Sequence, residues 1–384
     1  MKQVGKRSAG KNFLFALITI FIVWLIVEIV LSVFFFHRYS DEKLATIEAL
    51  KIGKAVLQGR PNSINVENQK LVRPQATDAV NKAIATETHE SNLFQYASWV
   101  EFSNIDYSGE HVNILHGIRK SIPENFINSG STDTIDIYFF GGSTMFGFNV
   151  ADSETLPSQF VLKYREQFPK GRSIRVHNFA TPTYYSYQEL IQYANLIFQG
   201  HRPDVVIFLD GVNDFWFGRA AYYNQSYFSF VLRQVFKGDL LAGGKFQLKD
   251  SSKYMFLDPP GIPPTTFNHG LIDNYLNSIR NASMLADATG AKAYFFCQPV
   301  PFYKYPNQQK DPICFRDQQT RYDVIYPAIE KMKDSLPHFT FLGNMLEKES
   351  GYPFVDGLHY SPSFTGKVAQ EILNKVGKEV AGNY

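Results

Sequence analysis

Residues 204–214 decide the fold, and they read DVVIFLDGVND. The run from Val205 to Leu209 is apolar throughout, rich in β-branched residues and hardly alternates with polar ones. This pattern is typical of a strand that is covered on both faces, as in a parallel sheet. The polar residues that follow Gly211 then lie at the carboxyl end of a central strand.

Similar apolar runs alternate with helical stretches along the rest of the chain. Further strands are predicted at residues 135–140, 174–179, 291–297 and, more weakly, 339–342. Helices are predicted at residues 153–167, 186–198, 271–288, 319–335 and 363–380. This alternation predicts an open α/β sandwich around a mainly parallel sheet of five strands. Functional sites in such sheets form where the strands end.

Polar residues with catalytic potential fall near these strand ends. Ser143 follows the first predicted strand and Asn213 follows the central one. Asp356 and His359 stand three residues apart before the last predicted helix. Each is equally well explained by a turn or a helix cap when taken alone. Together they supply the nucleophile, oxyanion donor, orienting carboxylate and base of an acyl-transfer site.

Four short segments resemble the sequence blocks of the SGNH (GDSL-like) hydrolase superfamily, in a membrane-anchored bacterial form. Residues 139–144 read FFGGST, with Gly-Gly-Ser-Thr in place of Gly-Asp-Ser. Residues 210–214 read DGVND and residues 356–359 read DGLH, which match the third and last blocks. Residues 178–183 read NFATPT, which keeps the asparagine of the second block and lacks both glycines. The resemblance covers about residues 135–384.

The resemblance implies a flavodoxin-like three-layer α/β/α sandwich and a serine-ester mechanism without a metal or cofactor. It implies a catalytic triad of Ser143, Asp356 and His359. The oxyanion hole would consist of the Ser143 N–H, the Thr183 N–H and the Asn213 side chain. Thr183 stands where the family has a glycine, and its branched Cβ restricts the backbone. This donor is therefore the point at which the chain departs from the family pattern.

The N-terminal region predicts a membrane anchor. Residues 13–36 form an apolar run of 24 residues, with basic residues and no acidic ones before it. A helix of this length reaches about 36 Å, more than the roughly 30 Å of a hydrocarbon core. A cleaved signal peptide is the alternative, but the run ends in bulky aromatic residues. We expect a signal anchor at residues 1–38, with a cytoplasmic N-terminus and the rest periplasmic or extracellular.

The remaining sequence predicts a stalk, a folded domain and an insertion. Residues 39–91 are polar and weakly patterned, as in a stalk, and the hydrolase-like domain is expected at residues 92–384. An insertion at about residues 215–270 is rich in aromatic residues over its first part, from Phe215 to Phe230. These rings would either form a lid or a sugar-stacking wall, or simply pack the insertion onto the sheet.

Composition and cysteine usage limit the possible partners. A net charge of +2 gives no sign of nucleic-acid binding. No group of histidines, cysteines or acids has metal-ligand spacing. Cys297 and Cys314 flank a proline-rich loop, so they predict either a disulfide or two separate buried thiols.

These features predict a serine esterase, a carboxylic ester hydrolase, that acts on acyl groups such as O-acetyl of a cell-surface glycan or on a small ester. An O-acyltransferase with the same triad is one alternative, with membrane acyl-transfer or polysaccharide-assembly partners. A non-catalytic glycan-binding or assembly protein on the same fold is the other. The anchor and the aromatic insertion motivate the glycan, because the triad itself does not distinguish water from a sugar hydroxyl.

Overall fold

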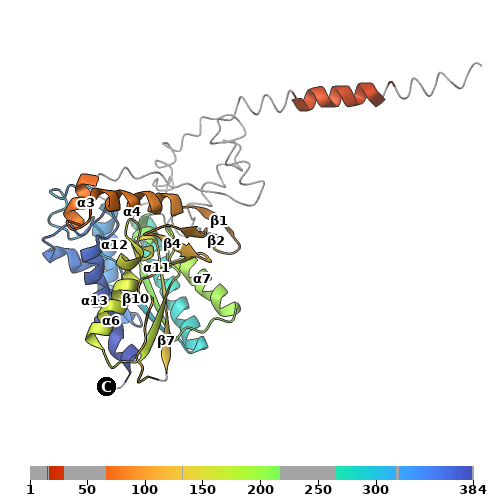
Figure 1. Cartoon of the computed structure of the whole chain (residues 1–384). Coiled ribbons are helices and arrows are strands. Elements are labelled where there is room, and N and C mark those ends of the chain that lie inside the picture. The colour runs from red at the N-terminus through yellow and green to blue at the C-terminus, as the bar shows by residue number, and fades with distance from the viewer. Residues whose placement is uncertain are drawn as a thin grey trace, which may run out of the picture.

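The computed structural model describes residues 15, 17–29, 66–131, 133–216, 264–316 and 320–382. Phe15 and residues 17–29, which belong to the predicted anchor, are helical (Figure 1, red). Among the described residues, no helix combines the length and the hydropathy that a membrane crossing requires. The anchor and the location of the domain therefore stay predictions.

A parallel sheet of five strands forms the centre of the domain, in the spatial order β11-β10-β9-β7-β8. Its strands are β7 (Thr134–Gly141), β8 (Ser173–Asn178), β9 (Val205–Asp210), β10 (Lys292–Cys297) and β11 (Phe339–Phe341). Every residue of β9 is buried, as expected for a strand covered on both faces. The pairing of Phe139 with both Asn178 and Ile207 places the carboxyl ends of β7, β8 and β9 at one edge.

The sheet is larger than the sequence predicts. Four short strands extend it antiparallel beyond β8, giving a mixed sheet of nine strands. They are β3 (Tyr107–Ser108), β4 (Asn113–Leu115), β5 (Ile118–Arg119) and β6 (Asn125–Phe126). Strands of two or three residues are too short to show a hydrophobic period, so the sequence gives no signal for them.

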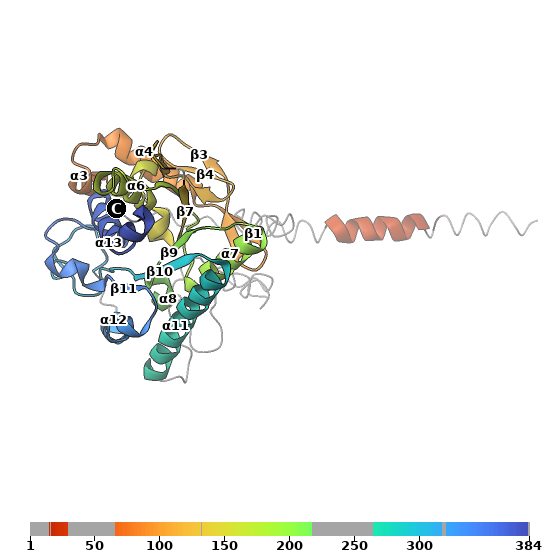
Figure 2. The same cartoon turned by 90° about the horizontal axis from the view of Figure 1, so that it is seen from below.

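Helices cover both faces of the central sheet, which gives three layers. α6 (Leu156–Gln167) and α13 (Pro362–Ala381) lie on one side, and α11 (Pro264–Thr289) and α12 (Thr320–Met332) lie on the other (Figure 2). α7 (Ser186–Phe198) packs beside α11. A separate hydrophobic core fills each side of the sheet, and neighbouring residues of β7 belong to different cores. Phe139 packs with Phe160 of α6, whereas Phe140 packs with Tyr193 of α7.

Residues 66–91, which were expected in the stalk, form two helices that contact the domain (Figure 1). They are α3 (Val66–Val72) and α4 (Asp78–Ser91). The Glu87 side chain of α4 accepts hydrogen bonds from the N–H groups of His111 and Val112, at 2.8 and 2.9 Å. Polar side chains make these contacts, and a hydropathy pattern therefore does not reveal them.

The aromatic insertion lies mostly outside the described residues, as do its rings from Phe217 to Phe230. Phe215 is described and fully buried, with its ring against those of Tyr275, Tyr322 and Tyr326. For this ring the packing interpretation holds. Both cysteines are buried and free, so of the two alternatives the structure has separate thiols.

Candidate active site

Ser143 lies at the carboxyl end of β7, as its position after the first predicted strand indicated. It is the first residue of the short helix α5 (Ser143–Phe146), and Gly142 is the N-cap. A Cβ atom on Gly142 would lie 2.3 Å from Asn213 Nδ2 and 2.9 Å from the Tyr184 carbonyl oxygen. Only glycine fits there, and its absence of a side chain lets the serine segment approach Asn213 closely.

His359 and Asp356 meet Ser143 from the other end of the chain. His359 Nε2 lies 2.8 Å from Ser143 Oγ, and His359 Nδ1 lies 2.7 Å from Asp356 Oδ2. A β-bridge between Phe354 and Tyr360 closes the loop that carries both residues. The structure thus brings the three predicted triad residues together with hydrogen-bond geometry in the order Ser–His–Asp.

Hydrogen-bond donors hold Asp356 in its ionised form. Asp356 Oδ1 accepts the N–H groups of Leu358 and His359, each at 2.9 Å, and Oδ2 accepts the side-chain amide of Asn149. Burial alone would raise the pKa of Asp356. The charge and hydrogen bonds of His359, with the Leu358 N–H, outweigh burial and lower the pKa below its ordinary value. The carboxylate is therefore negative at neutral pH.

Asn213 lies beside the nucleophile in the first turn of α8 (Val212–Trp216). Its side-chain amide donates a hydrogen bond of 2.6 Å to the Tyr184 carbonyl oxygen. A primary amide carries two N–H groups, so one remains for a ligand. The Tyr184 carbonyl also places the loop 181–184 next to Asn213 and Gly142.

Thr183 lies on this loop, which we call the oxyanion loop (residues 181–184). Its φ of 70° is in the left-handed region that favours glycine. The threonine therefore adopts a backbone conformation typical of glycine, at some cost in strain. The Thr181 N–H donates to the Gly141 carbonyl at 3.1 Å, which ties the loop to the end of β7.

A hairpin that the sequence analysis did not identify braces the oxyanion loop. It consists of β1 (Phe94–Ala97) and β2 (Glu101–Asn104). The Tyr184 hydroxyl donates to the Phe102 carbonyl, and Asn104 Nδ2 donates to the Ala180 carbonyl at 3.3 Å. The rings of Phe102 and Tyr184 also pack edge to face. No sequence motif marks these contacts, which join segments about 80 residues apart.

Three acids, the carboxyl cluster of Glu189, Asp210 and Asp214, are buried, and Asp214 directly follows Asn213 in the chain. Asp214 accepts the N–H of Ser186 at 3.2 Å and the N–H of Gly211, three residues before it, at 3.4 Å. Burial raises the pKa of Asp214 to about 6 and those of Glu189 and Asp210 well above their ordinary values. After burial, the neighbouring charge of Asp210 raises the pKa of Glu189 most, and no donor among the described residues reaches the Glu189 oxygens or Asp210 Oδ1.

Two further residues of the site were not predicted. Asn149, whose amide contacts Asp356, follows α5 in a turn, and its sequence context does not distinguish it from any turn asparagine. The ring of Phe148 packs against the His359 imidazole, with centroids 4.7 Å apart. Within the part of the chain that the structure describes, no group of three or more His, Cys or acidic residues could hold a metal ion.

Comparison with known proteins gives similarity at the level of solved structures. No protein-family model and no curated protein matches the chain. A G-D-S-L family lipolytic protein from Desulfitobacterium hafniense aligns at 9% identity and a TM-score of 0.36, covering 62% of this chain and 98% of that one. A catalytic mutant of an acetylxylan esterase from Geobacillus stearothermophilus aligns at 18% identity and a TM-score of 0.37, covering 66% and 99%.

An acylhydrolase from Bacteroides fragilis aligns at 12% identity and a TM-score of 0.34, covering 66% of this chain and 91% of that one. One of the three structures is described as that of a G-D-S-L family protein. With TM-scores below 0.5, these similarities do not identify an activity, which we infer from the site itself.

Proposed function

We propose that this chain is a serine esterase of the SGNH type, which hydrolyses carboxylic esters. The observation that carries the proposal is the continuous relay from Ser143 Oγ through His359 to Asp356, with distances of 2.8 and 2.7 Å. A serine within hydrogen-bond reach of a base, which is itself oriented by a carboxylate, is the arrangement that activates a serine nucleophile.

The reaction follows from these positions. Neutral His359 takes the proton of Ser143 Oγ through Nε2 while Oγ attacks the acyl carbon. Asp356 remains ionised and stabilises the imidazolium that forms. His359 then gives the proton to the leaving alcohol, which leaves an acyl group on Ser143. A water molecule, activated by the same imidazole, attacks this acyl-enzyme and releases the acid.

We assign the oxyanion of the tetrahedral intermediate to the Ser143 N–H, the Thr183 N–H and the Asn213 amide. Two observations support this assignment. Asn213 Nδ2 lies next to Gly142, and the left-handed backbone of Thr183 is the conformation that a glycine donor would adopt. Fixed donors of this kind each lower the barrier by about 3–4 kcal/mol.

For the substrate we propose an acyl group, such as O-acetyl, on a cell-surface glycan. Two sequence features support this: the apolar run at residues 13–36, which would anchor the chain in the cell membrane, and the aromatic insertion after Asp214. The catalytic domain would then face the periplasm or the cell exterior. Aromatic side chains present an apolar face to sugar rings, which suits a glycan.

An O-acyltransferase with the same triad is the second candidate. The side chains of His359 and Asp356 are only 12% and 10% exposed, and Ser143 is 8% exposed. A site that excludes water protects an acyl-enzyme long enough for a sugar hydroxyl to accept the group. The acceptor, rather than the triad, distinguishes the two activities.

The test is ester turnover by the full chain in detergent. We expect release of p-nitrophenol from p-nitrophenyl acetate and of acetate from acetylated oligosaccharides, abolished by Ser143→Ala and retained in Ser153→Ala, an exposed serine. Activity that survives Ser143→Ala would overturn the nucleophile. Acyl transfer to an oligosaccharide without release of acetate would select the transferase. Glycan binding without any turnover would select the non-catalytic alternative.

A further inference from the structure

Helix α3, which precedes the region of the SGNH sequence blocks, reaches the loops of the triad. Gln69 Nε2 donates a hydrogen bond of 2.6 Å to the carbonyl oxygen of Val355, the residue before Asp356. Arg73 directly follows this helix, and its Nη2 donates a hydrogen bond of 2.8 Å to the carbonyl oxygen of Asn149. Both side chains are buried, at 3% and 7% exposure.

Arg73 is held rigidly while it makes this contact. Its Nε lies 2.9 and 3.0 Å from the two carboxylate oxygens of Glu154, and its Nη2 lies 2.8 Å from one of them. Its Nη1 donates to Gln69 Oε1 at 2.9 Å, which couples the two side chains. A guanidinium fork bound at several of its N–H groups has little freedom to move, unlike an ammonium group.

Asn149 passes this constraint to the triad. Its backbone carbonyl is bound by Arg73, and its side-chain amide donates to Asp356 Oδ2, the oxygen that faces His359 Nδ1. Its left-handed backbone, with φ of 61°, aims the carbonyl and the amide in these two directions. A small apolar cluster of Val72, Val150 and Val355 packs the same three segments together.

We propose that Gln69 and Arg73 are positioning residues for the catalytic acid, so that a segment outside the SGNH-like region completes the active site. Gln69 fixes the loop that carries Asp356, and Arg73 fixes Asn149, the hydrogen-bond partner of Asp356. The inference rests on the proposed function, because it concerns the same triad. A misplacement of about 1 Å in such a relay lowers the rate by up to about 10²-fold.

The test uses the full chain with Arg73→Met, which removes the fork, and Arg73→Lys, which keeps the charge and most of the packing. We expect kcat for p-nitrophenyl acetate to fall by about 10–100-fold in Arg73→Met, with KM within about twofold of the parent. Arg73→Lys should show an intermediate kcat, and so should Gln69→Met. Each kcat is normalised to folded protein by a thermal unfolding curve.

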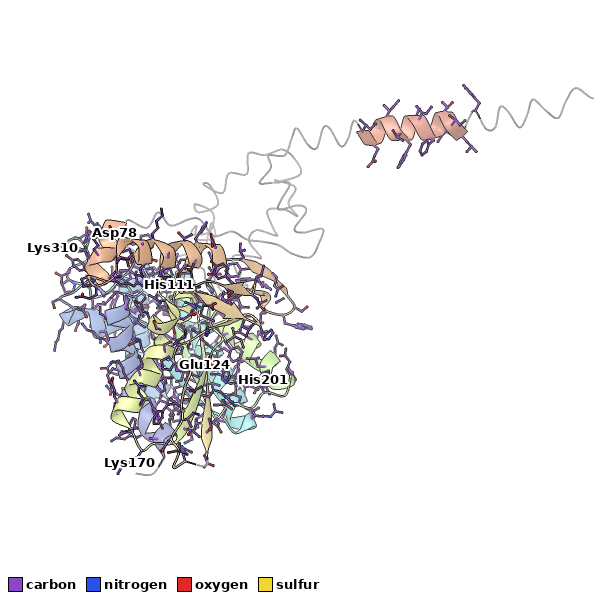
Figure 3. All side chains as sticks on the ribbon, viewed as in Figure 1. Asp78, His111, Glu124, Lys170, His201 and Lys310 are labelled. Atoms are coloured by element: carbon purple, nitrogen blue, oxygen red, sulfur yellow. The ribbon has the colours of Figure 1, made fainter. Side chains whose placement is uncertain are left out.

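Arg172→Met is the matched control. Arg172 also binds backbone carbonyls, those of Val380 and Glu379 at 2.9 and 2.6 Å. Lys170, two residues earlier in the chain, lies at the opposite end of the domain from Asp78 of α4 (Figure 3). We expect Arg172→Met to lower the unfolding temperature without changing kcat.

A second readout does not depend on turnover. The proton between His359 Nδ1 and Asp356 should give a low-field proton NMR signal, identified by its loss in His359→Gln. We expect this signal to shift or broaden in Arg73→Met and Arg73→Lys and to stay unchanged in Arg172→Met. Folded Arg73 and Gln69 variants with the parental signal and parental kcat would overturn the inference. A parent that carries the signal but turns over no ester would instead overturn the proposed function.

Discussion

Asp356 and the carboxyl cluster of Glu189, Asp210 and Asp214 are both buried, yet their pKa values shift in opposite directions. Four hydrogen bonds from N–H groups reach Asp356, and its pKa lies below the ordinary value. Neither oxygen of Glu189 receives an N–H or hydroxyl hydrogen bond from the described residues. Its pKa, like that of Asp210, is raised well above the ordinary value.

The difference shows that burial alone does not decide whether a carboxyl group is charged. Burial is the largest influence on the pKa of each of these acids, and it raises the pKa in every case. Whether the pKa ends above or below its ordinary value then depends on how many hydrogen-bond donors reach the carboxylate. The chain thus keeps one negative charge beside His359 and raises the pKa values of the three acids in the carboxyl cluster.

The largest expected effect comes from removing the charge of Asp356. An amide in Asp356→Asn no longer stabilises the imidazolium and favours the other imidazole tautomer. We expect kcat/KM for p-nitrophenyl acetate to fall by about 10³–10⁴-fold, with little change in the unfolding temperature. Asp323→Asn, at an exposed position of α12, is the control and should retain parental activity. A loss below tenfold in Asp356→Asn would mean that its charge does not serve the reaction.

The next effect concerns Asn213, the side-chain donor that we propose for the oxyanion. Asn213→Ala removes a proposed oxyanion donor and should lower kcat by about 10²–10³-fold, with a smaller change in KM. Steady-state kinetics with p-nitrophenyl acetate checks this. Asn277→Ala, in α11, is the matched control for loss of an amide. An unchanged kcat in Asn213→Ala would remove this residue from the oxyanion hole.

A smaller effect tests the carboxyl cluster through stability. The pKa values of its members are raised in the folded protein, so the folded state binds protons more tightly than the unfolded chain. Their contribution to stability is complete below the unfolded pKa values near 4 and is lost as the pH rises through the folded pKa values. For Asp214 the folded pKa is about 6. Glu189→Gln replaces one carboxyl group by an amide that does not ionise, and so removes one of these titrations.

We therefore expect Glu189→Gln to gain free energy of unfolding relative to the parent as the pH rises from 5 to 8. Each unit of pKa shift that is removed corresponds to about 1.4 kcal/mol. Denaturant unfolding curves at the two pH values give the comparison. An equal difference between variant and parent at both pH values would show that Glu189 is not protonated in the folded protein.

The smallest expected effect lies in the oxyanion loop. Thr183→Gly relieves a left-handed backbone that a branched side chain disfavours by about 1–2 kcal/mol, while the greater freedom of glycine in the unfolded chain offsets part of this gain. We expect a net gain of about 1 kcal/mol or less by thermal unfolding, with kcat at least as high as in the parent because the N–H is retained. A destabilised Thr183→Gly would show that the threonine side chain itself supports the loop.

The strands of the central sheet follow from local sequence signals, whereas the triad residues were recognisable only as a set. The apolar run at β9 and the residues after β7 were recognisable because strand, turn and polar residue are neighbours in the chain. The supports of the site were not recognisable. Arg73, Asn149 and the β1–β2 hairpin act through contacts between segments far apart in the sequence. Polar side chains make the first two contacts, and the hairpin consists of strands of only four residues.

The mixed sheet and the helices α3 and α4 illustrate the same limit. A strand of two residues has no period. Helices that contact the domain through polar side chains, such as Gln69 of α3 and Glu87 of α4, resemble solvated helices in composition. The φ of Thr183 was also beyond sequence reasoning. A glycine at that position would have indicated a left-handed turn, whereas the threonine adopts it against its own preference because the surrounding contacts dictate the conformation.

The contact between Gln69 and Val355 joins residues 286 positions apart. A ribosome makes Gln69 long before it makes Val355. The proposed nucleophile Ser143 is likewise made 216 positions before its proposed base, His359. On a growing chain this serine therefore has no histidine beside it until residue 359 has emerged and folded back.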